Sequence, residues 1–165
     1  AGSGLGYLGI SRMSNILVIL FAILDCKVWS IAQVAAWADG HISKLDSPKA
    51  WLLDLSIGDS VDSCLETVRE AMRESGVLLP ENVGELMAGF ILLRYDAGEL
   101  PEAQARSLIV DIVDAYETSS VDAEAAGTLS LDSSVYLDIR RSAEQALEYM
   151  SSDRYLESDR KLIND

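Results

Sequence analysis

Histidine and cysteine are two residue types in this chain whose side chains could act as a general base or a nucleophile. The single histidine, His41, follows Gly40 near the end of a predicted helix. Because histidine titrates near neutral pH, one hypothesis is an enzyme that uses His41 with a nearby carboxylate. A zinc site would need a second ligand three or four residues further on, where Lys44 and Leu45 stand. We therefore interpret His41 as a surface residue at a helix end and expect no bound metal.

Cys64 falls on a predicted apolar helix face with Leu65 and Val68, where a thiolate is disfavoured, so we expect it to pack in the core. Cys26 also stands among apolar residues, and two cysteines are too few for a disulfide scaffold. The sequence contains no GxGxxG, Walker or GxSxG motif and no Glu-x-x-His pair. These observations predict a reduced, cytoplasmic protein that is not an enzyme and has no cofactor.

Carboxylates are the most abundant ionisable side-chain groups of the chain. Asp and Glu number 27 against 13 Lys and Arg among 165 residues, which gives a net charge of −14. This charge repels phosphate backbones and anionic lipids, so we expect neither a nucleic acid nor a membrane as partner. A basic protein is the natural complement, although an acidic surface can also serve solubility alone.

The acids recur at helical spacing in two segments. On the predicted helix 61–76 they stand every four residues, and the segment from Asp96 to Glu124 holds eight acids against the single base Arg106. Tyr116 lies among these acids, and Tyr is enriched at binding hot spots. The predicted partner-binding residues are Asp96, Glu99, Asp111, Asp114, Tyr116, Glu117, Asp122 and Glu124, together with Glu66 and Glu70.

The candidate residues fall in segments whose apolar residues recur at helical spacing, which predicts that helices carry them. The pattern predicts helices over 16–24, 31–42, 48–58, 61–76, 82–98, 101–116 and 135–150, with an Ala-rich turn ending at Gly127. Ser47 before Pro48 and the Asn82-x-x-Glu85 spacing predict two helix N-caps. A strand over 16–23 is the alternative there, because that run is rich in β-branched residues. The predicted fold class is all-α, a single-domain bundle of six to eight helices.

The N-terminal residues 1–12 contain four glycines and no helical period, so we expect an added or disordered leader, with Met13 as the native start and one domain over 13–165. The apolar run Ile16 to Leu24 is nine residues long, whereas roughly 20 are needed to span a bilayer. Asp25 follows it directly, and no basic cluster precedes it. A buried first helix is therefore favoured over a signal peptide.

One stretch resembles a known class of proteins. Trp37-Ala38-Asp39-Gly40-His41-Ile42, Leu45-Asp46-x-Pro48 and Trp51-Leu52-Leu53-Asp54-Leu55-Ser56 together resemble small α-helical bacterial proteins, among them immunity proteins of contact-dependent inhibition and other polymorphic toxin systems. The resemblance implies a cytoplasmic antidote that binds a delivered toxin domain, often a nuclease, and blocks it by occlusion. It covers about twenty of the 165 residues and carries no functional position across.

Three functional hypotheses follow. The first is an immunity protein that binds a basic toxin domain through the acids of residues 96–124, with Glu66 and Glu70. The second is an acidic helical adaptor that self-associates or binds another protein through an apolar groove. The third is the enzyme that uses His41.

Overall fold

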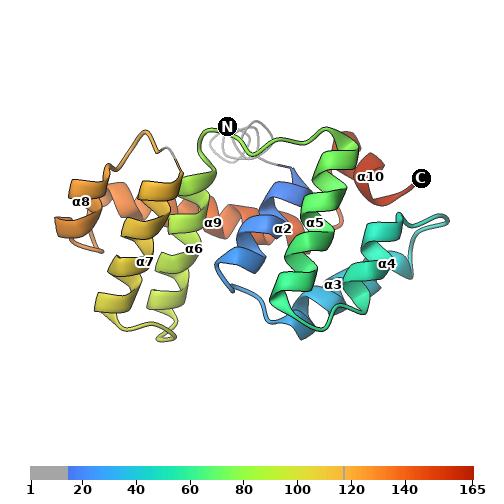
Figure 1. Cartoon of the computed structure of the whole chain (residues 1–165), viewed down its shortest axis with the longest axis horizontal. Coiled ribbons are helices and arrows are strands. Elements are labelled where there is room, and N and C mark those ends of the chain that lie inside the picture. The colour runs from blue at the N-terminus through green and yellow to red at the C-terminus, as the bar shows by residue number, and fades with distance from the viewer. Residues whose placement is uncertain (1–14, 117) are drawn as a thin grey trace. The chain divides into compact units, whose positions relative to one another are not determined.

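The computed structural model describes residues 15–116 and 118–165, and this part of the chain contains nine α-helices and no strand (Figure 1). The predicted all-α fold is therefore confirmed. The helices are α2 (Ile16–Asp25), α3 (Ile31–Ile42), α4 (Ala50–Ser56), α5 (Val61–Ser75), α6 (Val83–Asp96), α7 (Glu102–Ala115), α8 (Ala123–Thr128), α9 (Ser134–Ser151) and α10 (Glu157–Ile163). The predicted leader 1–12 and start at Met13 lie outside the described residues. No helix in the described part is both long and apolar enough to cross a membrane.

The helix count within the described residues exceeds the predicted six to eight because two short helices lacked a readable period. The Ala-rich turn before Gly127 is helix α8, and α10 follows the last predicted helix. The predicted cap at Ser47 is wrong, because α4 begins after Lys49. Asn82 is the N-cap residue of α6, as predicted, but its side chain makes no cap hydrogen bond.

Internal contacts divide the chain into two compact units. Residues Leu79–Glu148 form one, which we call the inserted unit; Asn15–Leu78 and Tyr149–Asp165 form the other, which we call the terminal unit. The prediction of a single domain over 13–165 did not specify this substructure. The long helix α9 begins in the inserted unit and ends in the terminal unit.

The terminal unit is built on α2, whose residues Ile16–Leu24 are all buried, which explains why that run shows no helical period. Asn15 caps the helix by accepting hydrogen bonds from the N–H groups of Leu17 and Val18. The apolar stripe of α5 packs against α2, and Gly76 ends α5 at a φ of 68°, where glycine avoids the cost of a side chain. The prediction of the α5 stripe and its end is confirmed.

The C-terminal residues complete the terminal unit through backbone and side-chain hydrogen bonds. The N–H of Lys49 donates to the carbonyl of Ile163 at 2.9 Å, and the indole of Trp51 donates to the carbonyl of Leu162 at 2.8 Å. Ser47, instead of capping a helix, donates its N–H to the side-chain Oδ1 of Asn164 at 3.0 Å and accepts at its carbonyl from the N–H of Asp165 at 2.9 Å. These contacts tie α10 to the start of α4.

A buried carboxylate joins α10 to α2. Asp159 is 2% exposed, and its Oδ1 accepts a hydrogen bond from the N–H of Ile16 at 3.2 Å. Its Oδ2 accepts from the hydroxyl of Tyr149. Burial raises the pKa of Asp159, and these two hydrogen bonds oppose the rise. The carboxylate lies at the N-terminus of α2, where the helix dipole favours its charge, but burial outweighs this and the pKa stays raised.

In the inserted unit α6 and α7 pack together, α8 packs on α7, and the first turns of α9 lie against α6 (Figure 1). Gly89 of α6 allows this last approach, because a Cβ at Gly89 would lie 2.7 Å from the carbonyl oxygen of Ile139 and 2.8 Å from the Cβ of Ala143. Arg140 of α9 binds both oxygens of Asp96 at the end of α6, at 2.8 and 3.0 Å. The helices thus meet through one close backbone contact and one bidentate ion pair.

Candidate functional site

The acid excess is unevenly divided between the two units. Residues 79–148 carry fourteen acidic and four basic side chains, whereas the terminal unit carries thirteen acidic and eight basic ones. The inserted unit therefore holds most of the net negative charge in fewer residues.

All four arginines of the inserted unit already form ion pairs inside it. The pairs are Arg94–Glu99 at 3.3 Å, Arg106–Glu102 at 3.4 Å, Arg140–Asp96 at 2.8 Å and Arg141–Asp138 at 3.7 Å. The other carboxylates that the structure describes in this unit form no ion pair with a described residue. The inserted unit consequently presents acids that no internal base neutralises.

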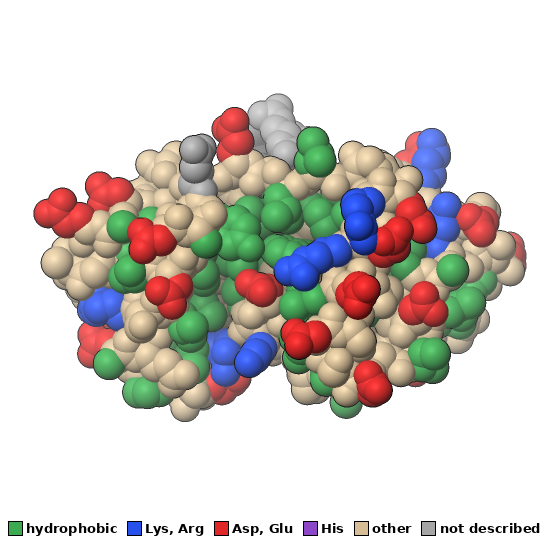
Figure 2. Space-filling model, in the orientation of Figure 1, with side chains coloured by type: hydrophobic (Ala, Val, Ile, Leu, Met, Phe, Trp, Pro, Cys, Tyr) green, Lys and Arg blue, Asp and Glu red, His purple; other side chains and the backbone are tan. Residues whose placement is uncertain are grey.

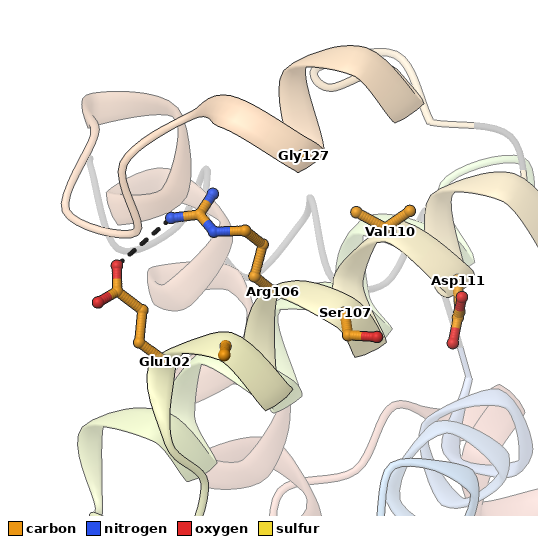
Figure 3. Close-up of a pocket in the computed structure, with 7 residues that line it drawn as sticks. Glu102, Arg106, Ser107, Val110, Asp111 and Gly127 are labelled. Carbon is orange, nitrogen blue, oxygen red and sulfur yellow. Dashed lines mark hydrogen bonds and ion pairs between the residues drawn. The ribbon is translucent and has the colours of Figure 1, made fainter.

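A groove of about 490 Å³ lies between α7 and α8 (Figure 3). Val110 and Arg106 rise from α7 on the side of α8, where Gly127 stands opposite, while Asp111 points away from α8 at the groove's edge. Ala103 and Ser107 complete the α7 wall. The groove thus has a partly apolar interior and a carboxylate on its outer side.

Arg106 closes one end of the groove and is occupied by internal partners. Its Nη1 donates to the carbonyl of Leu129 at 2.7 Å, and its Nη2 lies 3.4 Å from the carboxylate of Glu102. The hydroxyl of Tyr136 is buried without a hydrogen-bond partner among the described residues, and burial raises its pKa although the charge of Arg106 lowers it. The guanidinium of Arg106 therefore binds groups of the inserted unit itself and stabilises the fold rather than binding a ligand.

Four of the predicted partner-binding residues share the two packed helices of this groove. Asp111 and Asp114 are exposed on α7, and Glu124 is exposed in the first turn of α8. Asp122 is exposed as well and caps α8 by accepting a hydrogen bond from the N–H of Ala125 at 2.7 Å. Figure 2 shows acidic side chains over α7 and α8 on the face in view. We call Asp111, Asp114, Asp122 and Glu124 the α7–α8 acidic set.

The remaining predicted residues differ from this set. Asp96 and Glu99 are bound by Arg140 and Arg94, so part of their charge is neutralised internally. Tyr116 is half-buried at the end of α7, and Glu117 lies outside the described residues. Glu66 and Glu70 are exposed on α5 of the terminal unit, where Glu70 pairs with Arg73.

His41 belongs to an aromatic cluster of the terminal unit and is half-buried rather than a plain surface residue. The hydroxyl of Tyr155 donates its only proton to the carbonyl of Met150 at 2.6 Å and accepts from the indole of Trp37 at 3.1 Å. The Nε2 of His41, 3.0 Å from the same hydroxyl, must therefore be the donor in their hydrogen bond. Burial, aided by the charge of Lys44, lowers the pKa of His41. This Nε2 has no lone pair free to act as a general base.

The ring of Trp37 stacks on that of Trp51, with the ring centroids 6.4 Å apart and the planes inclined by 24°. Both cysteines are buried, and burial raises the pKa of the Cys64 thiol, which disfavours a nucleophilic thiolate. Among the described residues no group of three or more His, Cys, Asp or Glu side chains could hold a metal ion.

No protein-family model, no curated protein and no solved structure matches this chain.

Proposed function

We propose that this protein is a binding module that docks a cationic protein on its inserted unit, in the manner of an immunity protein that occludes a basic toxin domain. The observation that carries the proposal is the α7–α8 acidic set. Its member Asp111 lies at the edge of the groove, and none of its four carboxylates forms an ion pair with a described residue. The resemblance over residues 37–56 supports the same class, and it lies in the other unit, so the two lines of support are independent.

Electrostatics explains why such a surface would suit this task. Like charges gathered on adjacent helices repel one another and add nothing to folding. Towards a basic partner the same field raises the association rate, by roughly 10- to 1,000-fold, and this gain falls steeply as salt is added. Nucleases grip phosphate with basic surfaces, so an acidic binder that covers such a surface would block it by occupying the substrate's place.

A pair of charge-matched variants tests the proposal. The first variant replaces the α7–α8 acidic set by its amides, D111N, D114N, D122N and E124Q, and Asn at 122 keeps the cap of α8. The control removes the same charge from α5 of the terminal unit through D62N, E66Q, E70Q and E74Q. The protein captures its partner from lysate of its source organism, and the association rate of the purified pair is measured at several ionic strengths.

The expected result is an association rate at low salt that falls by about tenfold or more in the first variant and by less than about threefold in the control. Co-expression of the wild-type protein should then relieve the toxicity of the captured protein. Co-expression of the first variant should relieve that toxicity less. Equal effects of both variants, or an association rate independent of salt, would contradict the proposal.

Exposed apolar residues favour the adaptor as a second candidate. Leu53 and Ile57, four residues apart at α4, are 45% and 79% exposed. Burying such side chains between two copies would stabilise a dimer without any salt dependence. Light scattering over a range of concentrations tests this, and Ile57→Ser should shift the protein towards monomer if α4 carries the contact. The enzyme hypothesis has the least support, because His41 donates through Nε2.

A further inference from the structure

A second, smaller hollow of about 210 Å³ lies within the inserted unit, between the start of α6, the segment at Ser120 and the first turns of α9. Leu86 and Ile139, which are 2% and 6% exposed, form its base, and Val135 stands beside them. Its volume corresponds to about seven water molecules of the liquid, enough for one long side chain.

Glu85 lines this hollow with a carboxylate held in one orientation. Its Oε1 accepts hydrogen bonds from the N–H and the hydroxyl of Ser119, both at 2.8 Å, and from the N–H of Ser120 at 3.2 Å. Glu85 was expected to cap its own helix, but its side chain instead fixes the 119–120 backbone. Its other oxygen, Oε2, accepts no hydrogen bond and joins no ion pair with residues 15–116 or 118–165.

The ionisable side chains that line the hollow are both acidic. The other ionisable residue that lines it, Asp138, lies 3.7 Å from Arg141, and both side chains of that pair are largely exposed. No Lys or Arg is among the residues that line it. The hollow therefore combines an apolar base with one oriented carboxylate oxygen that has no cationic partner in the described part of the chain.

We propose that this hollow is the anchor site for one lysine side chain of the cationic partner, an inference that rests on the proposed function. The methylene stem would pack on Leu86, Val135 and Ile139, and the ammonium group would bind Oε2 of Glu85. A long cationic side chain buries its stem along apolar surface while its head keeps polar contacts, which fits this combination. Lysine is favoured over arginine because one carboxylate oxygen is already saturated by three donors, so the two-pronged guanidinium has no matching pair of acceptors.

A nuclear magnetic resonance titration of the ¹⁵N-labelled full chain tests the proposal with Nα-acetyl-lysine amide as the probe. The matched probe acetylated also at Nε keeps the stem and loses the charge. We expect saturable amide shifts confined to residues 85–86, 119–120 and 135–142, with a dissociation constant on the order of 10 mM. The uncharged probe and the corresponding arginine probe should bind at least about fivefold more weakly.

Two variants separate the contribution of the Glu85 charge from that of the open volume of the hollow, and a third serves as control. Glu85→Gln keeps an oxygen for Ser119 and Ser120 but removes the charge, and Glu81→Gln removes one charge at an exposed position outside the hollow. Ser142→Phe fills the hollow without changing any charge. Glu85→Gln and Ser142→Phe should each weaken the lysine probe at least about fivefold, and Glu81→Gln should leave it within about twofold, by the same titration.

Shifts that are absent, spread over the acidic surface, or unchanged in Glu85→Gln would overturn the anchor site. A partner that still binds with strong salt dependence, and that Glu85→Gln does not weaken, would refute the anchor and leave the proposed function standing. Saturable binding of the lysine probe at residues 85–86 without any salt-dependent partner would retain the site and refute the proposed function.

Discussion

Replacing Gly89 by Ala should destabilise the protein by up to about 2 kcal/mol. The added Cβ would stand 2.7 Å from the carbonyl oxygen of Ile139, 2.8 Å from the Cβ of Ala143 and 3.2 Å from Cγ2 of Ile139. Favourable contacts between such atoms lie at about 3.5–4.0 Å, so the first two fall short by close to an ångström. A backbone oxygen and a Cβ cannot rotate away, and α6 and α9 must therefore move apart.

The magnitude is the difference between two opposing effects. Overpacking of a well-filled contact costs about 1–3 kcal/mol, and the gain in helix propensity from Gly to Ala returns at most about 1 kcal/mol. Gly40 supplies the matched control, because it lies inside α3 with no atom within 4 Å of its added Cβ. Gly40→Ala should therefore stabilise the protein by about 0.5–1 kcal/mol through propensity alone.

Urea unfolding followed by circular dichroism measures both variants. The three tryptophans, Trp29, Trp37 and Trp51, all belong to the terminal unit, so their fluorescence reports that unit while circular dichroism reports all helices. Ala143→Gly removes the facing methyl at its own cost in helix propensity. In a double-mutant cycle, Gly89→Ala should therefore cost less in the Ala143→Gly background than in the wild type, since one of the two shortest contacts disappears. A Gly89→Ala protein as stable as Gly40→Ala would refute the close packing of α6 on α9.

Two further predictions concern buried groups of the terminal unit. Because the pKa of Asp159 is raised on folding, the folded state binds more protons above the unfolded pKa of about 3.9, so this group makes stability fall as pH rises through its folded pKa. Asp159→Asn should remove this pH dependence of the free energy of unfolding, measured in urea between about pH 4 and 7. The control Asp153→Asn, at an exposed position, should leave the pH dependence unchanged. Cys26 and Cys64 should react only slowly with a disulfide reagent in the native protein, because both are buried, and both should react fully in urea. A thiol that reacts at once in native buffer would contradict the burial of that cysteine.

Elements with strong local signals were predictable from the sequence. The α5 stripe places Cys64, Leu65 and Val68 in the core and stops at Gly76, as the 3.6-residue period and the C-terminal glycine indicate. α10 was missed because its seven residues are mostly polar and its buried anchor, Asp159, belongs to a residue type that is rarely buried.

Side-chain partnerships distant in sequence were beyond sequence reasoning. Acid spacing alone placed Asp96 among the docking residues, but its partner Arg140 stands 44 positions away and binds both of its oxygens. Glu85 showed the spacing of a helix cap and instead binds backbone 34 and 35 residues further on. The α7–α8 acidic set was within reach because its members lie near one another along the chain, so local helices suffice to gather them.

The split of the terminal unit across the sequence has a consequence for synthesis on the ribosome. The inserted unit is continuous and emerges whole, whereas α2 to α5 await residues 149–165 before their core is closed by Asp159 and the strand-like contact at Asn164. At translation rates of about 5–20 residues per second, that wait lasts roughly 4 to 17 seconds. Throughout it, the nine apolar residues of α2 lack part of their native cover, which makes this helix the segment of the nascent chain most in need of chaperone protection.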